Sequence, residues 1–177
     1  MFRFLLAAAC AAALLPATAP AAGTTNPDLQ FAARAASGGH AEVDLGKLAL
    51  QKSSDADVRQ FAQRMVDDHE KANRQLGSLA MRLHLRLPRH AEGKEAAEVK
   101  RLSGLSGAAF DRAYAQAMVD DHRHDIEDFK SEKENGALGP IHVFAENLLP
   151  VLEEHLRLAE QLQRNHGEEK AQAPGER

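Results

Sequence analysis

A nine-residue segment that occurs twice in the chain most constrains its fold. Residues 61–69 read FAQRMVDDH, and residues 114–122 read YAQAMVDDH. Seven of the nine positions are identical, and an eighth exchanges one aromatic residue for another. A looser copy, LPVLEEH at residues 149–155, again places a histidine after two carboxylates within an apolar helical pattern. Three histidines therefore occupy related places on three predicted helices, and their function depends on whether the fold brings them together.

The apolar periodicity and the capping residues predict four long helices. They are expected at residues 26–52, 55–87, 106–135 and 140–166. Asn26 is a good N-cap and Pro27 suits the first helical position, while Pro88 is expected to end the second helix. The connection at residues 89–105 is long enough to carry the chain along the bundle, and its middle, residues 92–102, is expected to form a short helix. We therefore predict an all-α fold, a ferritin-like four-helix bundle with a long, partly helical connection between helices two and three.

Glycine and proline residues inside two of these helices allow different interpretations. Gly38 and Gly39 lie in the middle of the first helix, where each costs about 1 kcal/mol relative to alanine. They indicate either a kink or the close approach of a neighbouring helix, and Gly46, two turns later on the same side, favours close packing. Pro150 lies inside the last helix and is expected to bend or split it.

The two ends of the chain are expected to lie outside the bundle. Residues 1–21 have the pattern of a secretory signal peptide, with Arg3, an apolar run at residues 4–15 and the small-residue sequence APA at 19–21. The predicted organisation is a signal peptide at 1–21, a bundle domain at 26–166 and a disordered tail at 167–177. We expect an exported protein, with the periplasm as its compartment. Because Cys10 is the only cysteine, the mature chain can form no internal disulfide.

Composition excludes several classes of partner. The formal net charge is −4, and aromatic residues make up 5% of the chain. A mildly acidic chain without a basic patch argues against nucleic-acid binding. The mature chain contains no predicted transmembrane segment and no basic amphipathic membrane helix. An envelope protein remains a candidate partner, and the sequence does not indicate an oligomeric state.

Projection of the predicted helices shows which residues face inward. At about 100° per residue, His69, His122 and His155 each lie in the middle of the apolar stripe of their helix. The first helix has no such histidine, but Glu42 takes the corresponding place. Residue counts from the two predicted turns put the four side chains within about one helical turn of the same height. We therefore expect Glu42, His69, His122 and His155 to form one buried polar layer.

The acidic pairs next to these histidines project differently. The pairs are Asp67-Asp68, Asp120-Asp121 and Glu153-Glu154. They fall on the flanks or the outer face of their helices, so we interpret them as solvated surfaces that hold nearby basic residues.

The buried layer has the chemistry of a metal site. Imidazole and carboxylate groups are ligands for zinc, copper, iron and manganese, and facing helices of bundles commonly supply them. Met65 and Met118 each precede a histidine by one turn on the same face, and thioether ligands favour Cu(I). Asp125 also falls within the inward arc of its helix. The predicted metal ligands are Glu42, His69, His122 and His155, with Met65, Met118 and Asp125 as possible additional ligands.

Two other interpretations of the layer stay open. Buried histidines can hydrogen-bond a carboxylate or a carbonyl and fix helix packing without any ligand. A catalytic acid–base role would need a cleft that reaches the layer. We assign no catalytic residue and no organic cofactor, and we expect the protein not to be an enzyme.

Four sequence blocks support a family resemblance. They are FAARAASGGHAEVDLGKLALQKS, VRQFAQRMVDDHEKANRQL, GAAFDRAYAQAMVDDHRHDIEDF and LLPVLEEHLRLAEQL. In this order, after a signal-like N-terminus, they resemble the bacterial exported family of unknown function DUF4142, whose members are often labelled predicted outer membrane proteins. The resemblance covers residues 28–162 and implies a ferritin-like bundle in the cell envelope, with no established activity.

The chain departs from the di-iron members of the ferritin-like group. Those proteins carry Glu-x-x-His on two helices, whereas Val66, Val119 and Leu152 stand three residues before the histidines here. The segment MVDDHEKA is also similar to the Met and His-His motif of another exported ferritin-like family, which is associated with copper, although Asp68 replaces the first histidine. The sequence thus predicts an exported bundle that binds a transition metal. The alternative is a structural or envelope-stress interaction module.

Overall fold

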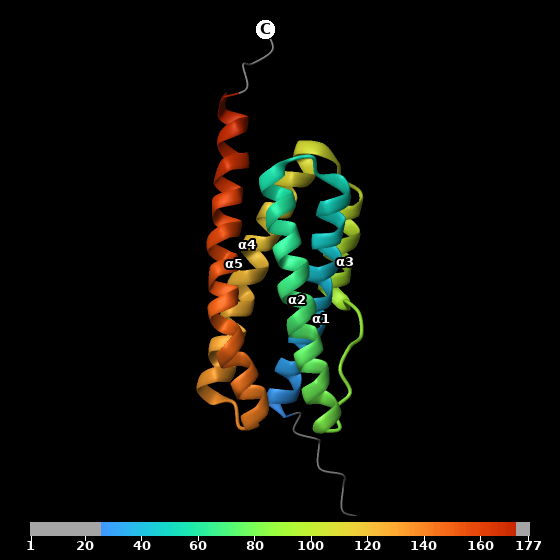
Figure 1. The fold of residues 1–177 in the computed structure, drawn as a ribbon, viewed down its shortest axis with the longest axis vertical. Coiled ribbons are helices and arrows are strands. Elements are labelled where there is room, and N and C mark those ends of the chain that lie inside the picture. The colour runs from blue at the N-terminus through green and yellow to red at the C-terminus, as the bar shows by residue number, and fades with distance from the viewer. Residues whose placement is uncertain (1–25, 173–177) are drawn as a thin grey trace, which may run out of the picture.

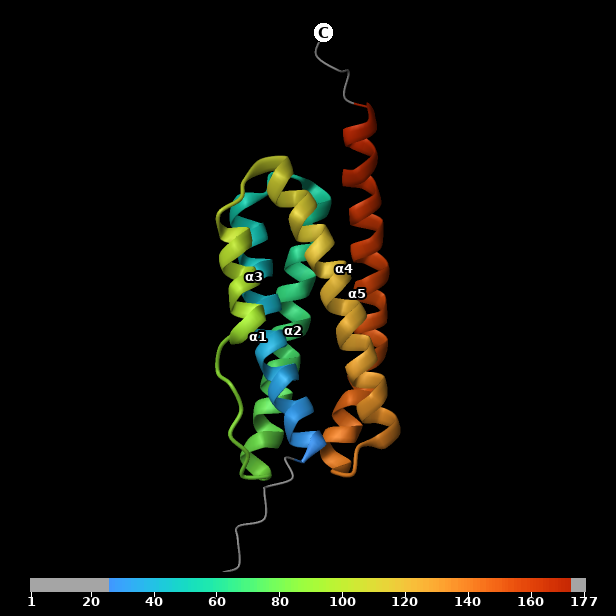
Figure 2. The same ribbon diagram turned by 180° about the vertical axis from the view of Figure 1, so that it is seen from behind.

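A computed structural model describes residues 26–172, with side chains up to residue 166. Its helices are α1 (Pro27–Lys52), α2 (Ala56–Arg82), α3 (Gly93–Ser103), α4 (Gly107–Asn135) and α5 (Gly139–Gln172). The four long helices lie side by side as a bundle, and α3 lies along its outside next to α1 (Figures 1 and 2). Within the described residues there is no strand. The predicted all-α bundle with a partly helical connection is therefore confirmed, and α3 is the helical part of that connection.

The long connection determines the direction of the helices. From the end of α2 it runs back along the bundle through α3, so that α2 and α4 point the same way (Figure 1). Helix α1 packs mainly against α2, and α4 packs mainly against α5. The two copies of the repeated segment are therefore carried by parallel helices, one from each helix pair. No helix in the described part of the chain combines the length and apolarity that a membrane crossing requires.

Side-chain caps define the first turns of α1 and α2. The Asn26 side chain accepts a hydrogen bond from the Asp28 backbone N–H, and Pro27 occupies the first helical position, as the sequence predicts. Asp55 caps α2 by accepting from the Val58 N–H at 2.9 Å. Buried Asp28 also accepts the backbone N–H groups of Ala137 and Leu138 at 3.0 and 2.5 Å, which ties the start of α1 to the turn between α4 and α5.

Helix α2 ends at Arg82, five residues before the predicted end at Leu87. His84 has a left-handed backbone with φ of 55°. The N–H of Leu85 donates to the Ala80 carbonyl at 2.8 Å, and the N–H of His84 donates to the Met81 carbonyl at 3.3 Å. This pair of bonds is a Schellman motif, which usually has glycine at the left-handed position. The prediction placed the end at Pro88 because no glycine marks the earlier one.

Helix α5 differs from its prediction in two respects. It is continuous through Pro150, so the predicted split does not occur. Its backbone runs to Gln172, past the predicted end at residue 166. The predicted signal peptide and residues 173–177 of the predicted tail lie outside the described residues.

The glycines of α1 allow α2 to approach closely. A side-chain carbon added at Gly46 would lie 2.8 Å from Val66 Cγ2 and 3.0 Å from the Ala62 carbonyl oxygen. One added at Gly39 would collide with the amide oxygen of Asn73. Helix α1 is continuous through these positions. Of the two interpretations, close packing is therefore the one that the structure confirms.

The core consists of two apolar clusters separated by a polar layer. Towards the C-terminal end of α1, one cluster includes Met65, Tyr114 and Met118. Towards its N-terminal end, the other includes Phe31 and Phe129. On every long helix the residue numbers of the two clusters leave a gap. Glu42, His69, His122 and His155 fall in these gaps, so the polar layer crosses the middle of the bundle.

Candidate metal centre

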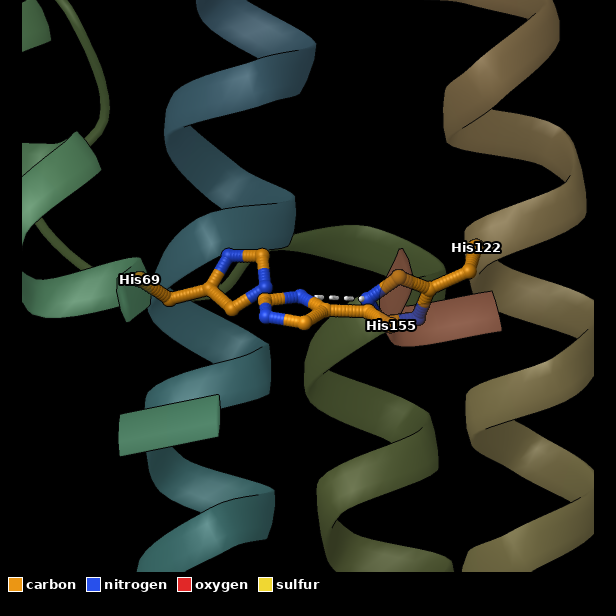
Figure 3. A group of neighbouring side chains, drawn as sticks. All are labelled: His69, His122 and His155. Carbon is orange, nitrogen blue, oxygen red and sulfur yellow. Dashed lines mark hydrogen bonds between the residues drawn. The ribbon is translucent and has the colours of Figure 1, made fainter. Parts of the chain in front are cut away.

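The structure brings together the four residues predicted to share a layer. Glu42 on α1, His69 on α2, His122 on α4 and His155 on α5 have exposed fractions of 1%, 3%, 0% and 0%. The three imidazole rings lie 5.3–5.7 Å apart, measured between centroids. Figure 3 shows them pointing toward one another from their separate helices. A single small ion would therefore be within reach of all three rings.

Glu42 and His69 form a tight buried pair. The Nδ1 atom of His69 lies 2.7 Å from Glu42 Oε2. Burial alone would raise the pKa of Glu42, but His69 and the other two histidines lower it to about 2. Burial alone would lower the pKa of His69, but Glu42 raises it. Glu42 is therefore ionised, and its carboxylate accepts the Nδ1–H of His69.

His122 is oriented by its own helix. Its Nδ1 atom lies 2.9 Å from the backbone carbonyl oxygen of Met118. Because a carbonyl oxygen can only accept a hydrogen bond, Nδ1 carries the proton and Nε2 carries the lone pair. That lone pair points into the layer, 3.3 Å from His155 Nδ1 (Figure 3).

His155 is oriented by a residue that the sequence analysis placed on a solvated face. Its Nε2 atom lies 2.9 Å from Asp68 Oδ2. Asp68 is partly exposed, and Arg64 Nε lies 3.5 Å from the same oxygen. A carboxylate accepts but does not donate, so Nε2 of His155 carries the proton and Nδ1 carries the lone pair. The interpretation of Asp68 as a solvated acid that holds a basic residue agrees with its contact to Arg64, but it missed the hydrogen bond from buried His155.

The three histidines thus share one arrangement. Each donates from one ring nitrogen to an acceptor outside the group, namely Glu42, the Met118 carbonyl or Asp68. His122 and His155 each keep a lone pair on the other nitrogen, and one nitrogen of each of the three rings lies within 4.8 Å of the others. The Nε2 atom of His69 is buried and has no hydrogen-bond partner. Metal-bound histidines in proteins are held in this way, with the second nitrogen donating to a carboxylate or a carbonyl.

The electrostatics of the layer keep His122 and His155 neutral. Burial lowers the pKa of His122 to about 4, although Glu42 opposes the shift. Burial and the neighbouring His69 lower the pKa of His155. Near pH 7 their facing nitrogens therefore meet as two lone pairs, without a proton between them.

The possible additional ligands lie in different surroundings. Met65 and Met118 are fully buried in the apolar cluster next to the layer. The backbone of Met118 orients His122, and no contact of either sulfur with a histidine is observed. Asp125 lies beside Glu42 but outside the three-histidine group. The histidines and Glu42 thus form the centre, and the two methionines border it.

A second group of polar atoms adjoins the first. Ligand atoms of Glu42, Asp121 and Asp125 lie within 4.8 Å of one another. Burial, and then Glu42, raise the pKa of Asp121 to about 7. Burial and the carboxylates of Glu42 and Asp121 raise the pKa of Asp125 well above its ordinary value. Three carboxylates thus meet inside the bundle, on the side of α1 and α4.

The acidic pairs of the sequence therefore divide into two kinds. Asp67, Asp120 and Glu153 are exposed, and the partly exposed Glu154 pairs with Arg157 and Arg64, in agreement with the solvated interpretation. Asp68 and Asp121 face neighbouring helices instead. Each stands one residue, or about 100°, before an inward histidine. This flanking position was visible in the projection and is the signal that could have identified both.

Comparison with models of known protein families identifies the family of this chain. The model of the domain of unknown function DUF4142 matches residues 13–162. The chain belongs to this family. No curated protein matches this DUF4142 chain in sequence.

Several solved structures share the fold of this DUF4142 chain. A DUF305 fragment from Deinococcus radiodurans is 18% identical, covers 80% of this chain and 97% of its own, and has a TM-score of 0.70. A DUF305 protein from Streptomyces coelicolor is 19% identical, with coverages of 80% and 94% and a TM-score of 0.68. CopM in its Cu(I)-bound form is 16% identical, with coverages of 78% and 96% and a TM-score of 0.64. At these identities the similarity shows a common fold alone.

Proposed function

We propose that this protein is an exported binder of a transition metal ion, held by His69, His122 and His155 with Glu42 beside them. The observation that carries the proposal is that three histidine rings converge while one nitrogen of each already has an acceptor outside the group. Glu42 accepts from His69, the Met118 carbonyl accepts from His122, and Asp68 accepts from His155.

The apo form of such a group is electrostatically unfavourable. His122 Nε2 and His155 Nδ1 face each other at 3.3 Å, and two lone pairs at that distance repel unless a cation lies between them. A proton is a poor candidate near pH 7, because the pKa of His122 is lowered to about 4. The buried Nε2 of His69 adds a third ring nitrogen without a hydrogen-bond partner, which costs about 1–3 kcal/mol. A bound metal ion would remove both penalties.

The donor set favours some metals over others. Neutral imidazoles suit zinc, copper, iron and nickel, whereas magnesium and calcium prefer oxygen ligands. Glu42 Oε1 lies 3.4 Å from His122 Nε2 and accepts no hydrogen bond, so this carboxylate is placed to complete a shell of four. The shared fold of CopM, solved with Cu(I), and the adjacent Met65 and Met118 make copper the first ion to test.

Export rests on the first residues of the chain. Arg3 followed by an apolar run and the sequence APA at 19–21 is the pattern of a cleaved secretory signal. We infer that the mature protein binds its ion in the periplasm.

The competing function is an interaction module in which the histidines only hold the helices in place. One observation favours it: each histidine already has one hydrogen-bond partner. It leaves the orphaned Nε2 of His69 unexplained, since a packing role alone would favour an apolar residue or a satisfied polar group there.

Thermal unfolding with and without metal tests the proposal. The chelator-treated mature protein should gain several degrees in Tm on addition of Cu(I) or Zn²⁺, because a ligand at one hundred times its Kd stabilises the folded state by about 2.7 kcal/mol. His122→Ala should abolish the gain. Asp68→Asn should weaken the affinity by about 10–100-fold, because His155 loses the acceptor that orients it.

Asp67→Asn is the matched control, since Asp67 is exposed and contacts only Gln63 among the described side chains. It should bind metal as the unaltered protein does. If Tm shifts with none of these metals, or shifts equally in His122→Ala, the layer only fixes helix packing. Circular dichroism at 222 nm checks that each variant keeps its helices.

A further inference from the structure

We infer a second cation site, made of oxygen ligands only, in which Glu42, Asp121 and Asp125 hold a hard divalent ion of the Mn²⁺, Mg²⁺ or Ca²⁺ class. It goes beyond the proposed function, because Asp121 and Asp125 are not ligands there, Glu42 is shared by the two sites, and oxygen ligands select another kind of metal. Carboxylate oxygens are the ligands that these ions prefer, and imidazole is not.

The three carboxylates come from two neighbouring helices. Asp121 and Asp125 lie one turn apart on α4 and therefore on the same face, and Glu42 reaches them from α1. One oxygen of each lies within 4.8 Å of the others. Like charges at such separations in a partly dry interior are unfavourable unless protons or a cation neutralise them.

The orphaned oxygen of this shared glutamate is the second observation that points to a ligand. Glu42 is 1% exposed, and its Oε1 atom receives no hydrogen bond. The nearest ring nitrogen, His122 Nε2, carries a lone pair and cannot donate to it. A buried carboxylate oxygen normally has a donor or a cation as partner. The described residues therefore supply no partner for Oε1, and a bound cation would be one.

The space beside these carboxylates suits a small ion. A void of about 10 Å³ is bordered by Glu42, Asp125 and Asn73, and a void of this size holds about one water-sized sphere. A larger ligand would require the helices to move apart.

A surface cavity reaches one member of this group, Asp121. Its volume is about 280 Å³, and it lies between α1, α3 and α4 with Asp121 in its wall. The ionisable residues that line it are Lys94, Glu95, Glu98, Asp120, Asp121 and His124. Carboxylates outnumber the single lysine, so the local potential favours cations over anions. Of the three carboxylates, Asp121 is thus the one that an ion in this cavity can reach.

Asp68 and Asp121 are matching residues of the repeated segment, but only Asp68 has an arginine one turn before it. Arg64 stands four residues before Asp68 and lies 3.5 Å from its carboxylate. At the matching position before Asp121, the chain has Ala117, which lines the cavity. In the first copy of the segment, Asp68 therefore has the Arg64 guanidinium beside it. In the second copy, Ala117 leaves the corresponding position next to Asp121 without a charged side chain.

Manganese binding followed by electron paramagnetic resonance tests the site, because the six-line signal of free Mn²⁺ disappears on binding. The metal-free mature protein should bind one Mn²⁺ at the carboxylates. Asp125→Asn and Ala117→Arg should each raise the Kd for Mn²⁺ by at least about tenfold. Asp67→Asn, the exposed control, should leave it unchanged.

A second set of measurements separates this site from the histidine site. His122→Ala should still bind Mn²⁺, and Asp125→Asn should still gain Tm with Zn²⁺, which also shows that this variant is folded. Mn²⁺ binding that is lost in His122→Ala but kept in Asp125→Asn would overturn the assignment. So would equal Mn²⁺ affinity in the unaltered protein and in Asp125→Asn, or no Mn²⁺ binding at all.

Discussion

Single residues hold the polar layer through acceptors that lie around it. Asp68 and the Met118 carbonyl each fix one ring, and Glu42 fixes a third. The helical projection predicted that His69 and His122 point inward, because their direction depends only on their own helix. It could not predict the partner of His155, because Asp68 reaches that ring only through the approach of α2 to α5.

A buried glutamate outside the layer provides a pH-dependent prediction at the same scale. Glu132 is 6% exposed, and its Oε1 has no hydrogen-bond partner. Burial and the nearby Asp28 raise its pKa, against the opposing effects of His142 and Arg34. The pKa of Glu132 in the folded state therefore lies above 4.5, its ordinary value in an unfolded chain. The stability that Glu132 contributes is fully present below pH 4.5 and is lost as the pH rises through the folded-state pKa.

We expect Glu132→Gln to be more stable than the unaltered protein at pH 7, and the difference to vanish below about pH 4.5, the unfolded reference value. Tm measured at several pH values gives the result. Glu127→Gln, on the exposed face of the same helix, is the control. A constant Tm difference across the pH range would show that Glu132 does not titrate as described.

At the scale of helices, the approach of α1 to α2 depends on glycine. The sequence suggested this from Gly38, Gly39 and Gly46, and the contacts of added side-chain carbons confirm it. Helix ends were harder to predict. Asn26 and Asn135 mark their ends by residue type, whereas the Schellman motif at His84 places a residue with a side chain where glycine is usual.

Two glycine substitutions separate packing from helix propensity. Alanine is favoured over glycine inside a helix by about 1 kcal/mol. Gly77→Ala should therefore stabilise the protein, because nothing lies within 4 Å of the added carbon. Gly46→Ala should destabilise it, because Val66 and a backbone oxygen of α2 are in the way and overpacking costs about 1–3 kcal/mol. Urea denaturation of both variants measures the difference, and effects of equal sign would contradict close packing at Gly46.

At the scale of the whole molecule, the layer joins all the long helices of the bundle at one height. Two apolar clusters lie on either side of it. Residue counts from the turns predicted this common height, because helical rise is nearly constant. They could not predict that α5 passes straight through Pro150, nor that Asp121 joins Glu42 on the side next to α3.

Hydrogen exchange should report this arrangement. If one ion binds side chains from separate helices, the central amides of α1, α2, α4 and α5 should be protected together on metal loading, because local opening of any of these helices would then require release of the ion. The amides of α3, which supplies no ligand, should change little. Protection limited to one helix pair would mean that the ion does not bridge the bundle.

The complete enclosure of the three imidazoles also determines how fast an ion held between them can leave. With His122 and His155 at 0% exposure, an ion held there can leave only when helices separate, so its escape follows the slow opening of the bundle. An ion at Asp121 borders a cavity and needs no such opening. The same protein would therefore retain one ion for long periods and exchange another quickly, which suits the inner position for storage and the outer one for sensing the surrounding concentration.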